Sequence, residues 1–268
     1  MHPARRLACL CLALSPMVAA PAGEPAAASL RARLGAASKT PLAAQKTRES
    51  LEAAFPAPAA AAVAIHQGDR RVCLATRLGE SGGFFAKTSL LTAVPAPETA
   101  DWFAELAGGA RLPLQVFRDF PEDDLTLLTL RPNPVGSAAD FGLPDALSAP
   151  ATGSLLMARP DPAAVHGVMG LVSVEAREIP EDGGMPASRQ RRMAQFHERA
   201  GTKLSARRTG FPRAFETDLD LSPEQCGTPV FDIDGRLAGI AIARATLSST
   251  LVIPAGRLRE LLAEASPR

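Results

Sequence analysis

The chain has 268 residues, 46% of them hydrophobic, and its 29 Lys and Arg nearly balance its 28 Asp and Glu, giving a formal net charge of +1. A chain of this length can bury a full core, as one large domain or as two smaller lobes. The charge balance argues against a general nucleic-acid binder, which would carry a basic surplus. The 21 Gly and 24 Pro favour a turn-rich fold of strands over a helix bundle.

The N-terminus has the three-part layout of a secretory signal peptide. Arg5 and Arg6 precede an apolar run over residues 7–20, and small residues then offer a cleavage site after Ala22. We predict that residues 1–22 are a signal peptide and that the mature protein is periplasmic or secreted; the alternative is a buried apolar helix. Beyond this segment no apolar run reaches the roughly 18–20 residues of a spanning helix, so we expect no membrane span in the mature chain.

Residues 23–48 are rich in Ala and Pro and are predicted to form a flexible lead, with a short helix around Lys46–Ala54. Removal of the signal peptide takes away two of the four cysteines and leaves Cys73 and Cys226. Two cysteines are too few for a disulfide framework. They can pair in an oxidising compartment if they lie close together, which the sequence leaves open.

Short apolar and β-branched runs follow one another through the rest of the chain and predict two sets of six strands. The first set is Ala61–Gln67, Arg71–Leu78, Gly83–Ala86, Leu90–Val94, Leu112–Phe117 and Leu125–Leu130. A Pro-rich interval over residues 132–150 then marks a boundary between two lobes. The second set is Gly153–Arg159, Val168–Ala176, Phe215–Asp218, Pro229–Asp232, Leu237–Arg244 and Leu247–Ile253.

The last segment, residues 254–265, starts with Pro and repeats Leu at helical spacing, which predicts an amphipathic helix. Six strands, a connector, six strands and a helix predict an all-β fold of two packed six-stranded antiparallel β-barrels with a C-terminal helix. The expected domain covers residues 49–265, with the first barrel at about 58–131 and the second at about 151–253.

Eight short sequence blocks in this chain resemble, in the same order, the blocks of a known protein family. The blocks are Gly82–Phe85, Lys87–Thr92, Asp124–Leu128, Gly170–Ser173, Thr217–Asp218, Glu224–Pro229, Gly235–Ile240 and Val252–Pro254. Their sequence and order resemble the trypsin-like (chymotrypsin-fold) peptidases, most closely the HtrA-type and glutamyl-endopeptidase branches. The resemblance spans roughly residues 50–264 and implies the double-barrel fold of that family.

The resemblance also implies roles for individual residues. Asp124 matches the aspartate that orients the catalytic histidine, and Cys226 stands at the position of the nucleophilic serine. Three neighbours of Cys226, namely Glu224, Gln225 and Gly227, match the loop that binds the oxyanion. Asp220, six residues before Cys226, matches the position of a specificity determinant in trypsin-like enzymes.

The departures from the family pattern point to a degenerate triad. The residue three places after Leu91-Thr92, where the family has its histidine, is Pro95, and sliding the register places Ser89 there instead. The four histidines, at positions 2, 66, 166 and 197, lie away from this block. Glu224 replaces the glycine whose N–H helps to bind the oxyanion, and a carboxylate there opposes developing negative charge.

A serine or cysteine nucleophile in this fold needs an oriented base to take its proton. Without one, a cysteine of ordinary pKa is only about 3% thiolate at pH 7, and losing a triad as a unit costs on the order of 10⁶ in turnover. We therefore predict a pseudoprotease, without hydrolysis, cofactor or metal, that acts by binding a peptide or a protein. The alternative is a divergent active endopeptidase that uses Cys226 with an unrecognised base.

Several residues keep a structural interpretation beside the functional one. Asp124 can serve as a strand-start residue with structural hydrogen bonds, Cys226 as a small core residue, and Asp220 as a solvated loop carboxylate. The segment 177–213 holds nine Lys or Arg against four Asp or Glu. It is either a docking element for an anionic partner or a solvated insertion with a short helix near Ser188–Arg199. The partner and the oligomeric state remain open at this point.

Overall fold

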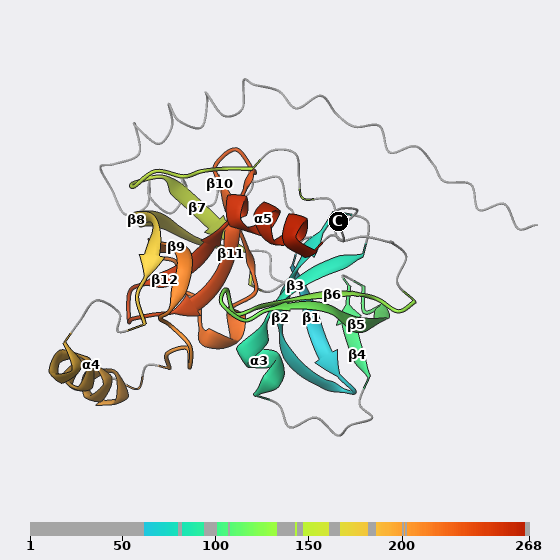
Figure 1. Ribbon diagram of the computed structural model, residues 1–268, viewed down its shortest axis with the longest axis horizontal. Coiled ribbons are helices and arrows are strands. Elements are labelled where there is room, and N and C mark those ends of the chain that lie inside the picture. Colours follow the sequence, from blue (N-terminus) through green and yellow to red (C-terminus); the bar gives the residue numbers. More distant parts are fainter. Residues whose placement is uncertain are drawn as a thin grey trace, which may run out of the picture.

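The computed structural model describes residues 62–79, 82–93, 101–106, 108–132, 143, 147–160, 167–181, 186–199, 201 and 203–265. The expected signal peptide, the lead with its helix around residues 46–54, and Pro95 lie outside these residues. Figure 1 shows the two lobes that the described residues form, with the C-terminal helix α5 lying across the top of their junction.

Six antiparallel strands form the first lobe. They are β1 (Ala62–Gln67), β2 (Arg70–Leu78), β3 (Gly83–Lys87), β4 (Trp102–Glu105), β5 (Arg111–Phe120) and β6 (Leu125–Leu130). They close into a barrel in the order β1-β2-β3-β6-β5-β4. The inward-facing side chains of β1, β2 and β3 are buried because closure places one face of every strand in the barrel interior.

Six more antiparallel strands form the second lobe. They are β7 (Leu155–Ala158), β8 (Val168–Ile179), β9 (Phe211–Thr217), β10 (Pro229–Asp232), β11 (Leu237–Arg244) and β12 (Thr250–Pro254). They close into a barrel in the order β10-β11-β12-β9-β8-β7. The predicted fold of two six-stranded antiparallel barrels with a C-terminal helix is confirmed.

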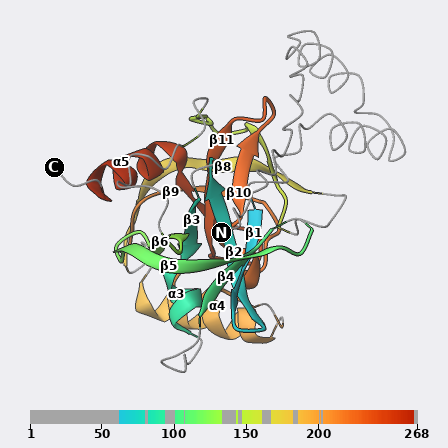
Figure 2. The ribbon, with the colours of Figure 1, turned by 90° about the vertical axis from the view of Figure 1, so that its right-hand side faces the viewer.

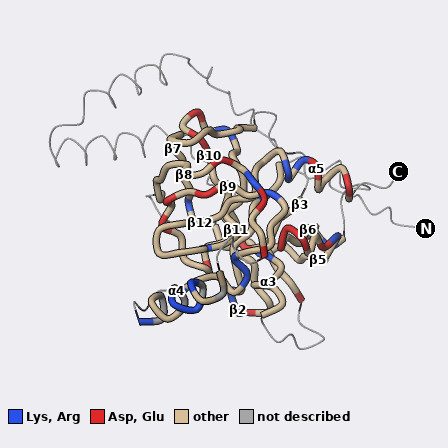
Figure 3. Tube along the Cα trace, turned by 60° about the vertical axis from the view of Figure 1, so that its left-hand side comes forward, with Lys and Arg blue, Asp and Glu red and all other residues tan. Residues whose placement is uncertain are grey.

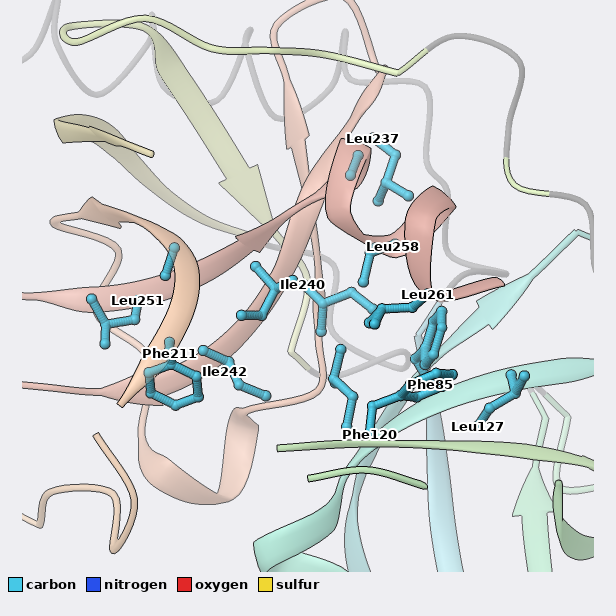
Figure 4. Close-up of a cluster of buried hydrophobic side chains, with 14 of the residues drawn as sticks. Phe85, Phe120, Leu127, Phe211, Leu237, Ile240, Ile242, Leu251, Leu258 and Leu261 are labelled. Atoms are coloured by element: carbon cyan, nitrogen blue, oxygen red, sulfur yellow. The ribbon is translucent and has the colours of Figure 1, made fainter. Parts of the chain in front are cut away.

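The largest hydrophobic cluster joins the two barrels rather than filling either one (Figure 4). Phe85, Phe120 and Leu127 come from the first barrel, and Leu258 and Leu261 come from α5 (Ala255–Ala265). All five side chains are at most 6% exposed. Burial of such side chains contributes about 1.5–3 kcal/mol each, so α5 and the facing barrel surfaces hold the lobes in one arrangement.

One predicted strand of the first barrel was wrong, and one observed strand was not predicted. The run Leu90–Val94, predicted as a strand, begins inside a short helix, α3 (Thr88–Thr92). The bond from the Thr88 N–H to the Asp124 carbonyl continues the pairing of β3 with β6 by one residue, and the Asp124 carboxylate then accepts the Ser89 N–H in the first turn of α3. A five-residue apolar run does not distinguish strand from helix by periodicity. The missing strand is β4 (Trp102–Glu105), which pairs with β1 and is too short to stand out.

Helix α4 (Ala187–Arg199) projects from the second barrel and lies at the bottom of the views in Figures 1 and 2, away from α5. It is the short helix expected near Ser188–Arg199, and Figure 3 shows its concentration of basic residues. Among the helices that the structure describes, none is both long and apolar enough to cross a membrane.

Candidate functional site

The site lies where the two barrels face each other. The first barrel contributes Asp124, which lies in the turn between β5 and β6. Asp124 has a left-handed backbone, with φ of 54°, which Asp tolerates because its short side chain bonds locally. The buried carboxylate accepts the backbone N–H and the hydroxyl of Ser89, both at 2.8 Å. Asp124 is therefore bound to the first turn of α3, and Ser89 is the residue that the shifted sequence register placed at the histidine position.

The histidine side chain that the structure describes, His66, lies on β1 and faces a different carboxylate. Its Nε2 is 3.2 Å from Glu105 Oε2 on β4. His2, His166 and the side chain of His197 are outside the described part of the chain. Within the described residues, Asp124 is paired with a hydroxyl and an ammonium group rather than with an imidazole.

That ammonium group belongs to Lys87, the last residue of β3, which is only 1% exposed. Its Nζ lies 3.3 Å from Asp124 Oδ2 and donates to the carbonyls of Ile242 at 2.5 Å and Arg207 at 3.3 Å. Three acceptors match the three N–H bonds of an ammonium group. Lys87 thus links the first barrel to β11 and to the segment before β9. Sequence analysis missed it, although a lysine ending a buried apolar strand was its signal.

Cys226 is the contribution from the second barrel, and it is fully buried. Its Sγ is 3.8 Å from the Ser205 Oγ and 3.8 Å from the Ser222 carbonyl oxygen. Burial raises the pKa of the Cys226 thiol, while the charge of Lys87 and the bond to Ser205 act in the lowering direction. Cys73 and Cys226 are both free thiols, so the pairing left open by the sequence is absent between these two residues.

The loop before Cys226 folds into a short 3-10 turn, η2 (Pro223–Gln225), with a capping box between Ser222 and Gln225. The Cys226 N–H donates to the Pro223 carbonyl at 3.2 Å. Glu224 has a lowered pKa, first because its own backbone amide bonds its carboxylate. An oxyanion site needs free N–H donors aimed at one point, and these two donors are engaged within the loop.

Gly227 fixes this loop against the first barrel. Its φ is 99°, and a Cβ there would lie 2.0 Å from the carbonyl oxygen of Leu74 on β2. The Gly227 carbonyl accepts the Thr76 hydroxyl at 2.8 Å, and its N–H donates to Ala241 on β11 at 2.7 Å. Glycine is required here by both backbone conformation and space, so the position of Cys226 is tied to both barrels.

Asp220, the candidate specificity residue, lies at the rim of a hollow of about 300 Å³. The side chain of Asp220 is 84% exposed, and its Oδ1 accepts from Arg244 Nη1 at 2.6 Å. Arg244 is only 13% exposed, and its guanidinium also donates to the carbonyls of Leu221 and Leu247. The carboxylate of Asp220 is therefore neutralised by a cation of the same chain.

The segment Lys203–Gly210, between α4 and β9, covers the site from outside. The Ser205 N–H donates to the Arg244 carbonyl at 3.1 Å, and its Oγ accepts the Arg244 N–H at 2.9 Å. Ser205 is 2% exposed, and it lies over Cys226. Sequence analysis missed Ser205, because nothing in a polar, basic stretch marks one serine as buried.

These contacts define what the arrangement can do chemically. The Asp124 carboxylate, the Lys87 ammonium and the N–H of Cys226 each have a partner inside the protein. Within the described residues, no group of three or more His, Cys, Asp or Glu is placed to hold a metal ion. The site is a closed polar network in which a base beside the thiol and a free oxyanion pocket are both lacking among the described groups.

The sequence matches no protein-family model and no curated protein. Solved structures do resemble it: Rv3671c from M. tuberculosis H37Rv, in a mutant, inactive form, has a TM-score of 0.50 and 14% identity, covering 80% of this chain and 89% of that one. The MamO protease domain from Magnetospirillum magneticum, in its apo form, has a TM-score of 0.49 and 19% identity, covering 75% of this chain and 95% of that one. At these identities the likeness concerns the fold, and the chain has the double barrel of trypsin-like peptidases.

Proposed function

We propose that the protein is a catalytically inactive trypsin-like peptidase homologue, of the HtrA-type or glutamyl-endopeptidase-like branch, that binds a peptide or a protein segment. The observation that carries the proposal is the closed state of the site. Cys226 lies buried under Ser205, its N–H is bonded to Pro223, and Asp124 is held by Ser89 and Lys87. A nucleophile without a base or an oxyanion pocket gives no useful hydrolysis.

The peptidase fold supports a binding function because β11 has an edge beside the former nucleophile position, which Ser205 covers in this structure. The β10 strand pairs with β11 only as far as Ile240, so the backbone of Arg244 extends past that pairing. An extended peptide adds to such an edge through main-chain hydrogen bonds. Export to the periplasm or the medium is part of the proposal and rests on the sequence of residues 1–22.

The experiment is covalent labelling of the native protein with a fluorophosphonate and, separately, with a thiol probe that reports turnover at Cys226. We expect neither reagent to react at the site of the native protein. An active trypsin-like enzyme is the positive control for the first reagent, and the same protein unfolded in urea is the positive control for the second. Labelling of native Cys226 that turns over would contradict the proposal.

One observation favours the second candidate, an endopeptidase that uses Cys226 as its nucleophile. The charge of Lys87 acts to lower the pKa of Cys226, which is how reactive thiols are made. Burial acts more strongly in the opposite direction at this residue. The candidate requires hydrolysis by the wild type that disappears in Cys226→Ala, and equal cleavage by both proteins rejects it.

A further inference from the structure

The segment Lys203–Gly210, which we call the strap, occupies the place where a peptide would bind. The pairing of β10 with β11 ends at Pro229 and Ile240. The next residue of β11, Ala241, donates its N–H to the carbonyl of Thr228 in the turn after Cys226. Beyond that point the N–H and C=O of Arg244 both bond Ser205. The strap thus supplies one main-chain bond, from the Ser205 N–H, and one side-chain bond, through the Ser205 hydroxyl, to the backbone of Arg244.

The strap is held by polar contacts and little apolar packing. Of its residues Ser205 alone is buried, and the others are half-buried or exposed. The carbonyl of Arg207 accepts from Lys87, and Lys203 lies 3.6 Å from Glu224 across an exposed ion pair. Exposed pairs contribute only about 0–1 kcal/mol, so the Lys203 end of the strap is weakly held, and the bonds of Ser205 and Arg207 keep the strap in place.

The contacts of the Arg207 side chain indicate which side chain of a ligand would fit at the same position. Its guanidinium lies 4.9 Å from the centre of the Phe211 ring, and it donates to the carbonyls of Glu122 at 2.6 Å, Gly210 at 2.7 Å and Pro121. It thereby reaches from the second barrel to the turn before β6 on the first. Planar bidentate donation and stacking on a ring are properties of Arg that Lys lacks.

The groove around Arg207 is acidic. It has a volume of about 730 Å³, and three glutamates, Glu122, Glu178 and Glu181, contribute to its lining together with Arg207 and Phe211. Arg207 is the one basic side chain among the residues that line it. Three glutamates and one arginine line the same groove, which leaves an excess of negative charge there, so the groove is complementary to a basic ligand.

From these contacts we propose that the strap occupies the binding site of a peptide ligand. That ligand is an extended segment with a small polar residue two positions before an arginine. The ligand displaces the strap, pairs with Arg244 on β11 and places its arginine against Phe211 and Glu122. The inference rests on the peptide-binding function proposed above and adds the chemistry of the ligand. It also makes strap opening the step that exposes Cys226.

The tether explains why the free protein is closed. A segment joined to its own binding site acts at an effective concentration in the mM range, so a free peptide of equal affinity does not displace it at μM concentration. A peptide that binds measurably therefore needs either a weakened strap or contacts beyond the strap's own. Weakening the strap is the change that can be made deliberately.

The test uses an opened variant, Ser205→Pro/Arg207→Glu, which removes the N–H that bonds Arg244 and places a carboxylate in the acidic groove. The probe is a fluorescein-labelled peptide with the sequence of residues 203–210, and its control is the same peptide with Glu at the place of Arg207. By fluorescence anisotropy we expect the opened variant to bind the probe at least about tenfold more tightly than the wild type does. We expect about tenfold weaker binding of the control peptide.

Reaction of Cys226 with a maleimide reports whether the strap has opened, in a Cys73→Ser background where it is the remaining thiol of the mature chain. An opened variant that keeps its cooperative unfolding, exposes Cys226 and still fails to bind the probe would overturn the inference. Equal binding of the probe and the control peptide would overturn the proposed arginine preference in the same way.

A second variant, Ser205→Cys in the same background, tests the placement of the strap without loosening it. Because Ser205 Oγ and Cys226 Sγ are 3.8 Å apart, we expect a disulfide on oxidation that protects both thiols from maleimide until a reductant is added. Absence of that disulfide in the folded variant contradicts the strap position. Failure of the proposed function looks different, because the probe peptide is then cleaved, which mass spectrometry detects.

Discussion

Two neighbouring aspartates, Asp123 and Asp124, sit at the same turn and hold opposite sides of the junction between the barrels. Asp123 is 1% exposed and receives two bonds from Arg257 on α5, at 2.9 and 3.3 Å. Asp124 is 3% exposed and faces Lys87 and Ser89 on the strap side. Each carboxylate has one cation, but the two cations differ in their access to water.

The ion pair of Asp123 with Arg257 is therefore partly open to solvent, whereas the ion pair of Asp124 with Lys87 is fully buried. The side chain of Arg257 is 16% exposed and also pairs with Glu260 and Glu264, so water and other carboxylates remain near it if Asp123 is lost. Lys87 is buried at 2% side-chain exposure and has acceptors only inside the protein. Removing one member of a sealed pair leaves an uncompensated charge, so the strap side is the more sensitive of the two.

The largest effect is expected for Lys87→Met, which leaves Asp124 buried without its cation. Breaking a buried pair costs about 3–5 kcal/mol, so the free energy of unfolding should fall by that amount in urea titrations at pH 7. The double variant Lys87→Met/Asp124→Asn removes both charges and should recover part of the loss. If the two single costs add up in the double variant to within about 0.5 kcal/mol, the two residues are not coupled.

A smaller effect is expected for Arg257→Met on the other side. Asp123 is itself buried, but the position of Arg257 is 16% exposed, so water can reach the carboxylate once the guanidinium is removed; charged hydrogen bonds contribute about 1.5–3 kcal/mol. We expect a loss of unfolding free energy in this range, below that of Lys87→Met, with peptide binding by the opened strap variant unchanged. A loss equal to or larger than that of Lys87→Met would reverse the comparison.

The dry strap side also predicts a loss of stability at alkaline pH. Burial raises the pKa of Cys73 from 9.0 to about 12 and raises that of Cys226 in the same direction. The folded state keeps these protons while the unfolded state loses them above pH 9, so their contribution is complete below pH 9 and falls as the pH rises. The Cys73 thiol lowers the unfolding free energy by about 1.4 kcal/mol per pH unit between pH 9 and 12, and the Cys226 thiol acts in the same direction.

The Cys73→Ser variant isolates the contribution of Cys226 in this experiment. Urea titrations at pH 8, 9 and 10 should still show a fall above pH 9, less steep than in the wild type. A stability that no longer depends on pH in this window would mean that Cys226 is hydrated, and that the strap side is as open to water as the α5 side.

The smallest effect is expected for Ser89→Ala. It removes one hydroxyl donor from Asp124 while the backbone N–H of residue 89 and Lys87 remain, so the cost should be about 1 kcal/mol by urea titration. The matched control is Ser248→Ala on an exposed loop, with a change within about 0.5 kcal/mol. A cost near that of Lys87→Met would assign Ser89 the main part in holding Asp124.

The sequence predicted the barrels because their signal is local. The runs at β6 (Leu125–Leu130), β10 (Pro229–Asp232) and β11 (Leu237–Arg244) were predicted with the observed bounds, since apolar runs between turn residues suffice to identify them. The element replaced by α3 could not be predicted in this way. Its first turn is bonded through the Ser89 N–H to the carboxylate of Asp124, a residue 35 positions later in the chain.

The residues of the site also fall into those that a local sequence pattern predicted and those that it did not. Asp124 and Cys226 were identified from their blocks, and both lie at the junction of the barrels. The partners that close the site, Lys87 and Ser205, were missed because their contacts cross about 120 and about 21 positions of sequence, respectively. Long-range contacts carry no local pattern, so the sequence identified the family positions and not the groups that now fill the space between them.

The central claim, that the fold is kept while hydrolysis is lost, is tested most directly by incubating the purified protein with a diverse peptide library. Cleavage products are then counted by mass spectrometry for the wild type and for Cys226→Ala. The account expects the two proteins to give the same products as buffer alone. Products that appear with the wild type and disappear with Cys226→Ala would contradict it and establish Cys226 as a working nucleophile.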